Sequence, residues 1–125
     1  MFKVDTKEKF VIIRLPEGVF TVNVSAAFTT FVTNQLNQSV KNIIADFTDV
    51  SSVEEQSLPE LSTLHQLVYK NNASFVLCNI NDSVKKIFDD HDLSDVLNIT
   101  PTESEAWDIV QMEEIEREIF GEEDI

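Results

Sequence analysis

The sequence predicts a single α/β domain, in which a mixed, mainly parallel β-sheet is combined with about four helices in the order β-β-α-β-α-β-α-β-α. Two observations predict it. Short apolar runs alternate along the chain with longer segments whose apolar residues recur three or four positions apart, as in amphipathic helices. Strands that alternate with helices favour right-handed crossovers between parallel strands. The second observation is the length of 125 residues, which suffices for one core but not for two.

Two strands are predicted at the start of the chain, over residues 2–4 and 10–15. The charged segment 5–9 joins them as a hairpin turn. Residues 16–18 (Pro-Glu-Gly) are expected to end the second strand, because proline and glycine interrupt regular structure.

A helix over residues 25–38 and a strand over residues 42–47 are predicted next. Ser25 is the predicted N-cap of the helix. The helix carries its apolar residues on one face: Phe28, Phe31, Val32 and Leu36. The strand is hydrophobic on both sides, which predicts that other elements cover both of its faces.

The chain continues with a predicted helix over residues 57–70 and a strand over residues 74–80. Pro59 suits the first turn of the helix, where its missing N–H costs nothing. The inward stripe of the helix is predicted to be Leu58, Leu61, His65 and Val68. Cys78 lies in the middle of the strand, so we expect it to be buried and unreactive.

A short helix over residues 82–90, capped by Asp82 or Ser83, precedes a short strand over residues 96–99. The last helix is predicted to start after Thr102, with Ala106, Ile109 and Val110 as its apolar stripe. These elements complete the predicted domain.

We place the domain at residues 1–112 and an acidic C-terminal helix extension and tail at residues 113–125. The extension is expected to continue the last helix with its apolar residues covering the fold; a partner-binding acidic segment is the alternative. Gly121 is the predicted end of the helix, which leaves residues 122–125 frayed.

Composition excludes several classes of function. Nine Lys and Arg are scattered among twenty-three Asp and Glu, for a formal net charge of −14 at pH 7. Binding to phosphate backbones needs clustered Lys and Arg, so we expect no nucleic acid and no anionic membrane as a direct partner. No apolar run approaches a membrane span and no secretory signal opens the chain, which predicts a cytoplasmic protein without membrane insertion. A basic protein partner is compatible with the charge.

The residues give little support to catalysis. We expect that the protein is not an enzyme and that it binds no metal and no cofactor. Glu54 and Glu55 could form an acid/base pair, but neighbouring side chains at a helix start diverge, and carboxylates there favour the positive end of the helix. The run of residues 89–92 (Asp-Asp-His-Asp) reads as a helix end rather than a metal site. His65 is expected to be a hydrogen-bonded core residue rather than a base. No glycine-rich phosphate loop occurs.

The order of elements and several runs of residues resemble the STAS domain, the fold of bacterial anti-sigma factor antagonists. The resemblance covers roughly residues 9–110. The matching runs are 46–53, 54–58, 75–80, 82–88, 93–99 and 102–106. It implies a non-enzymatic protein–protein interaction domain whose partner is an anti-sigma factor or a related regulator. The alternative is a STAS-like structural or sensory subunit that self-assembles or binds a small ligand, and the oligomeric state stays open.

The resemblance also implies where the partner binds. Family members open the helix with Asp-Ser-Ser-Gly-Leu, and the second Ser accepts phosphate from the partner. An ungapped match puts Glu54, Glu55, Gln56 and Ser57 in place of Asp-Ser-Ser-Gly. Because Gln56 has no hydroxyl, we expect these four residues to bind a partner without phosphorylation. Ser57 would accept phosphate only if the register slipped by one residue, and Glu55 would place a fixed negative charge beside the site.

Overall fold

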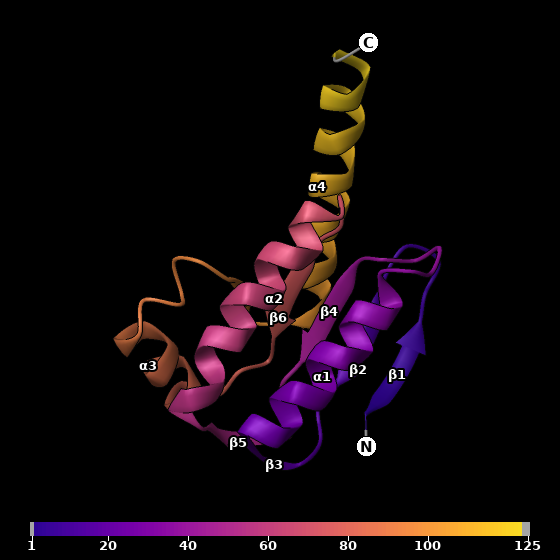
Figure 1. Ribbon diagram of the computed structural model, residues 1–125. Helices are drawn as coiled ribbons and strands as arrows, with labels where there is room; N and C mark the ends of the chain where they lie inside the picture. Colours follow the sequence, from indigo (N-terminus) through magenta and orange to yellow (C-terminus); the bar gives the residue numbers. More distant parts are fainter. Residues whose placement is uncertain (1, 124–125) are drawn as a thin grey trace.

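The computed structural model describes residues 2–123, and its centre is a five-stranded sheet (Figure 1). The strands are β1 (Lys3–Thr6), β2 (Val11–Arg14), β4 (Ile43–Asp46), β6 (Phe75–Cys78) and β7 (Asn98–Thr100). They lie in the order β1-β2-β4-β6-β7. β1 and β2 are antiparallel, whereas all other neighbours in this sheet are parallel. The predicted mixed, mainly parallel sheet is confirmed.

Helices cover both faces of the sheet. Within residues 2–123 the α-helices are α1 (Val22–Gln35), α2 (Leu58–Lys70), α3 (Asp82–Asp90) and α4 (Glu103–Glu123), and a short 3-10 helix, η1 (Glu55–Ser57), leads into α2. Ile43 and Ala45 of β4 belong to the larger core, shared with α1, α2 and α3. Ile44, between them, packs with Ala106 and Val110 of α4 on the other face. The cover on both faces predicted for this strand is confirmed.

A second sheet of two strands is a feature that the sequence does not predict. It consists of β3 (Gly18–Phe20) and β5 (Val50–Val53), which pair in parallel. Residues 16–18 do end β2, but Gly18 also opens β3 with a φ of 110°, a conformation that other residues rarely adopt. Its N–H donates to the carbonyl oxygen of Asp49 at 3.0 Å. β3 is three residues long and directly follows Pro16 and Glu17, and β5 (VSSV) has only two apolar residues, so neither shows the apolar run of the predicted strands.

The start of α1 differs from the prediction. The helix begins at Val22 and is capped by Thr21, whose hydroxyl accepts a hydrogen bond from the N–H of Val24 at 3.1 Å. The predicted cap Ser25 lies inside the helix, where it is buried and donates its hydroxyl to Glu60 of α2. Thr and Ser are both good capping residues, so composition alone does not separate them. The contact with α2 explains why Ser25 is buried.

The predicted cap of α3 is also wrong, by one or two residues. Asn81, rather than Asp82 or Ser83, caps this helix by accepting a hydrogen bond from the N–H of Val84 at 2.8 Å. Its amide nitrogen donates to the carbonyl oxygen of Val50 at 3.0 Å. The side chain of Asn81 thus satisfies one backbone group on α3 and one on β5.

Gly121 does not end the last helix. α4 runs without a break from Glu103 to Glu123, and residues 124 and 125 lie outside the described part of the chain. The expectation that the apolar residues of the extension cover the fold is wrong, because Ile115, Ile119 and Phe120 are exposed. A glycine inside a helix costs only about 1 kcal/mol relative to alanine, which does not by itself stop a helix of this length. In the described range 2–123, no helix has both the length and the apolar character to cross a bilayer.

Cys78 is fully buried between the sheet and α4, as predicted. Burial raises the pKa of its thiol to about 12, so the reactive thiolate is scarce at neutral pH. We expect no labelling by a disulfide reagent at pH 8 in the folded protein, and labelling of one thiol per chain in urea. Rapid labelling of the folded protein would show that α4 opens or that Cys78 is reactive.

His65 is not the hydrogen-bonded core residue that the sequence predicts. Leu64, rather than His65, joins Leu58, Leu61 and Val68 in the buried face of α2. The imidazole is half-buried, with its centroid 4.5 Å from that of the Tyr69 ring. Its Nδ1 is buried, with no hydrogen-bond partner among the described residues. Burial lowers the pKa of His65, because it disfavours the charged imidazolium.

This environment predicts a pH-dependent stability. Since the pKa of His65 is lower in the folded than in the unfolded state, its neutral form stabilises the fold fully above the unfolded value near 6.5. That stability is lost as the pH falls from 6.5 through the folded pKa. Urea unfolding of the wild type and of His65→Gln at pH 7.5 and 5.5 measures the effect. The wild type should lose more free energy of unfolding than the variant, and equal losses would contradict the prediction.

Candidate functional site

Residues 54–57 lie where β5 passes into α2, and Glu54 fixes this segment to the fold. The backbone N–H of Glu54 donates to the carbonyl oxygen of Phe20 at the end of β3, at 3.0 Å. Its side-chain Oε1 accepts a hydrogen bond from the N–H of Val22 at 2.8 Å. A negative charge at that place stabilises α1, because it lies at the positive end of the helix dipole. Glu54 therefore joins the start of α1 to the start of α2.

Ser57 is also bound into the fold. Its side chain is only 2% exposed, and its hydroxyl donates to the carbonyl oxygen of Glu54 at 2.7 Å. The N–H of Ser57 donates to the same carbonyl oxygen at 3.0 Å. These bonds close the turn of η1, and the Oγ of Ser57 faces the protein interior rather than solvent.

Glu55 and Gln56, between these two anchors, are exposed. Glu55 Oε1 lies 3.5 Å from Nε2 of His91, at the end of α3, and the two form an ion pair when the imidazole is protonated. The side chain of Gln56 makes no hydrogen bond within residues 2–123. The structure thus presents two polar side chains on a short, well-anchored turn beside the end of α3.

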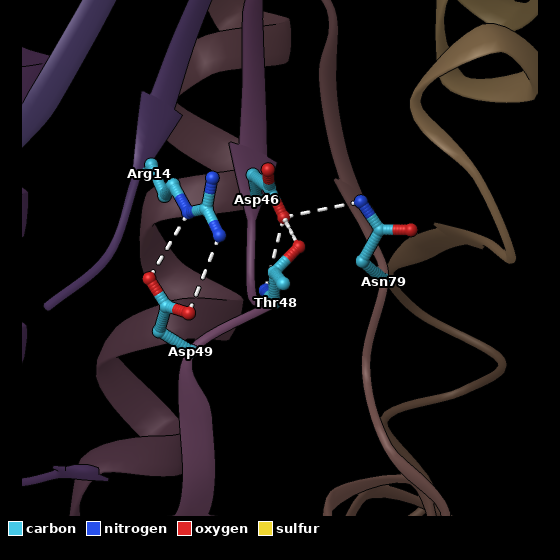
Figure 2. A network of polar contacts seen from close by, with 5 residues as sticks. All are labelled: Arg14, Asp46, Thr48, Asp49 and Asn79. Atoms are coloured by element: carbon cyan, nitrogen blue, oxygen red, sulfur yellow. Dashed lines mark hydrogen bonds and ion pairs between the residues drawn. The ribbon is translucent and has the colours of Figure 1, made fainter. Parts of the chain in front are cut away.

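A network that the sequence analysis missed stabilises the neighbouring turn at the carboxyl edge of the sheet (Figure 2). The carboxylate of Asp46 is the centre of one half. Its Oδ1 accepts hydrogen bonds from the N–H of Thr48 at 2.9 Å, from the Thr48 hydroxyl and from the amide nitrogen of Asn79 at 3.1 Å. An Asp followed two residues later by Thr is a common turn signal. The bond to Asn79 depends on the packing of β4 beside β6.

Arg14 and Asp49 form the other half of the network. The guanidinium approaches the carboxylate with two nitrogens, Nε to Oδ2 at 3.0 Å and Nη2 to Oδ1 at 3.3 Å (Figure 2). Asp49 raises the pKa of the Arg14 guanidinium through this hydrogen bond and its charge. These contacts join the end of β2 to the turn before β5, and the end of β4 to the loop after β6, and so hold together the carboxyl edge of the main sheet.

Glu54 and Glu55 do not form a carboxylate pair. Glu54 points to the start of α1 and Glu55 points to α3, so their side chains diverge as the sequence analysis expects. The sequence predicts residues 89–92 to be a helix end rather than a metal site. In this run, Asp89 accepts a hydrogen bond from the Ser94 hydroxyl. Within the described residues, no group of three or more His, Cys, Asp or Glu side chains is placed to hold a metal ion. Residues 54–57 offer an exposed polar surface on a turn that hydrogen bonds of Glu54 and Ser57 anchor to the fold.

Comparison with known proteins finds solved structures with a similar fold. A search of curated proteins found no match. Among solved structures, the Thermotoga maritima protein TM1081 is 22% identical, with a TM-score of 0.78 over 88% of this chain and 94% of that one. The unphosphorylated anti-sigma factor antagonist SpoIIAA is 20% identical, with a TM-score of 0.71 over 89% and 96% of the two chains.

A third structure is that of an anti-sigma-factor antagonist (STAS) domain protein from Planctomyces limnophilus. It is 12% identical, with a TM-score of 0.70 over 84% of this chain and 93% of that one. At such identities these likenesses show the fold. The family follows from the sequence itself, because the family model of the STAS domain matches residues 1–106. The chain therefore belongs to the STAS domain family.

Proposed function

We propose that this STAS domain is a cytoplasmic, non-enzymatic module that binds a protein partner through Glu54, Glu55, Gln56, Ser57 and the surface around them. The observation that carries the proposal is the contrast within this segment. The side chains of Glu54 and Ser57 hydrogen-bond to the fold, whereas the exposed side chains of Glu55 and Gln56 make no hydrogen bond to the described residues. The backbone of Glu55 and Gln56 is held between two hydrogen-bonded neighbours, so little backbone freedom would be lost when a partner binds their side chains.

The same residues support binding without a phosphorylation switch. SpoIIAA has been solved in a phosphorylated form. Here Gln56 stands at the position where the resemblance puts the phosphate-accepting Ser, and it has no hydroxyl. The neighbouring Ser57 hydroxyl is buried and already donates a hydrogen bond. Glu55 supplies a constant negative charge at this surface, although a carboxylate has less charge and fewer acceptor oxygens than a phosphate.

The proposed partner is an anti-sigma factor or a related regulator with a basic binding surface. The family and its anti-sigma factor antagonist relatives support a protein partner. The net charge of −14 favours encounter with a positively charged surface. Acidic groups at this site include Glu54 and Glu55, so a basic surface would meet them directly.

A capture experiment from a lysate of the source cell tests the proposal. Immobilised wild type should retain a basic-surfaced protein that Glu55→Ala loses. The matched control is Glu105→Ala, which removes an exposed carboxylate from α4 and should retain the same protein. Retention by Glu55→Ala, or equal loss by Glu105→Ala, would contradict a role for this surface.

Intact mass after incubation with ATP and the captured partner tests the missing switch. We expect no phosphate on the wild type and phosphate on Gln56→Ser, which restores a hydroxyl at the matching position. Phosphate on Ser51, Ser52 or Ser57 of the wild type would overturn constitutive binding. Light scattering after size-exclusion chromatography tests the alternative of self-assembly, because a dimer that buries residues 54–57 would leave no surface for another partner.

A further inference from the structure

The outward face of α4 carries an apolar stripe, which we define as Met112, Ile115 and Ile119. These side chains are 55%, 57% and 50% exposed. Their spacing of three and four residues places them on one side of the helix. Exposed apolar residues that occur singly are normal, but three aligned on one helical face form a continuous surface of the kind that partner helices bury.

The opposite face of the same helix is held against the domain. Glu113 accepts a hydrogen bond from the Tyr69 hydroxyl at 2.7 Å, and Glu114 accepts one from the amide nitrogen of Asn42 at 2.7 Å. Arg117 donates to the Ser74 hydroxyl at 3.1 Å. These contacts set the rotation of α4 about its axis, so that the apolar stripe points away from the sheet. Figure 1 shows the C-terminal part of α4 extending beyond the rest of the domain.

The stripe is bordered by carboxylates. Asp108, Glu116 and Glu118 are exposed on α4, and within residues 2–123 none of them forms a salt bridge. Arg117 is the one Lys or Arg in the sequence of α4, and it is turned toward the domain. The accessible face of the helix therefore combines apolar side chains with negative charge only.

We propose that this face is a second protein-binding surface, whose occupant is an amphipathic helix of a protein partner that carries Lys or Arg beside its apolar residues. Apolar residues of that helix would cover the stripe, and its cations would meet Asp108, Glu116 and Glu118. A second copy of α4 fits poorly, because pairing two stripes brings rows of like charge together. The surface is separate from residues 54–57, which precede α2 on the other face of the sheet, so it does not depend on the function proposed above.

A synthetic amphipathic peptide of Leu and Lys, with Leu at helical spacing, is the probe, and fluorescence anisotropy with the full chain measures its binding. Control peptides are a scramble of the same composition and a version with Glu in place of Lys. The Leu/Lys peptide should bind about tenfold or more tightly than either control. The double variant Ile115→Ser/Ile119→Ser should weaken binding of the Leu/Lys peptide by about tenfold or more.

The matched control is Val4→Ser/Val96→Ser, which removes apolar residues of 42% and 44% exposure elsewhere on the surface. It should bind the peptide like the wild type, and circular dichroism should show all variants folded. Equal binding of the scrambled peptide, or no effect of the stripe variant, would show general charge attraction and overturn the proposal. Self-association abolished by the stripe variant would show that a second copy is the occupant and would overturn it as well.

Discussion

Replacing Phe47 with alanine is expected to lower the free energy of unfolding by about 3–5 kcal/mol, as for other fully buried phenylalanines. Phe47 directly follows β4 and is 1% exposed. Its ring centroid lies 5.7 Å from that of Phe20 in β3 and 6.3 Å from that of Phe88 in α3. The side chain therefore fills the space between the main sheet, the small sheet and α3. Truncation leaves a cavity where three elements meet, and urea unfolding at pH 7.5 measures the loss.

Phe120→Ala is the matched control, because it makes the same change at a side chain that is 61% exposed. Exposed truncations of this kind change the free energy of unfolding by less than about 0.5 kcal/mol. A loss at Phe47 below about 1.5 kcal/mol would mean that the surrounding side chains collapse into the space. In that case the ring would not be what holds β3 and α3 to the sheet.

The main sheet was predictable because its central strands are hydrophobic on both faces. β4 and β6 are fully buried, and their runs IIAD and FVLC interrupt the helical periods of the neighbouring segments. The small sheet was not predictable in the same way. β3 is three residues long and begins at Gly18, which has a positive φ. In the sequence, Gly18 ends a Pro-Glu-Gly run that is typical of a turn. Its existence depends on pairing with β5, 30 or so residues later, and on burial of Phe20.

The candidate segment could be located from the sequence, but the contacts that its residues make could not be predicted. Residues 54–57 form the polar start of a helix that follows a strand, and loops at such places often carry functional residues. Nothing local shows that the Glu54 carboxylate accepts a hydrogen bond from Val22, because the two are 32 residues apart. The bond between Asn79 and Asp46 likewise joins the ends of two strands that only the sheet order brings together.

Replacing Asp46 with alanine is expected to cost about 2–3 kcal/mol, because a buried charged acceptor is lost and its donors are left unpaired. Asp46 is 8% exposed, and its Oδ1 accepts hydrogen bonds from Thr48 and Asn79. Without it, the N–H of Thr48 and the amide of Asn79 lose a partner at the carboxyl edge of the sheet. Urea unfolding measures the cost, and amide hydrogen exchange at Thr48 should become faster in the variant.

Asp49→Ala is the control, since it removes a carboxylate from the same turn. The ion pair between Arg14 and Asp49 has side chains that are 40% and 36% exposed. Exposed pairs contribute at most about 1 kcal/mol, because water and salt screen them and two side chains must be ordered. Asp46→Ala should therefore cost at least twice as much as Asp49→Ala, and only the latter cost should shrink at high salt. If Asp49→Ala cost as much, the ion pair would contribute as much as the buried carboxylate, which would contradict the prediction.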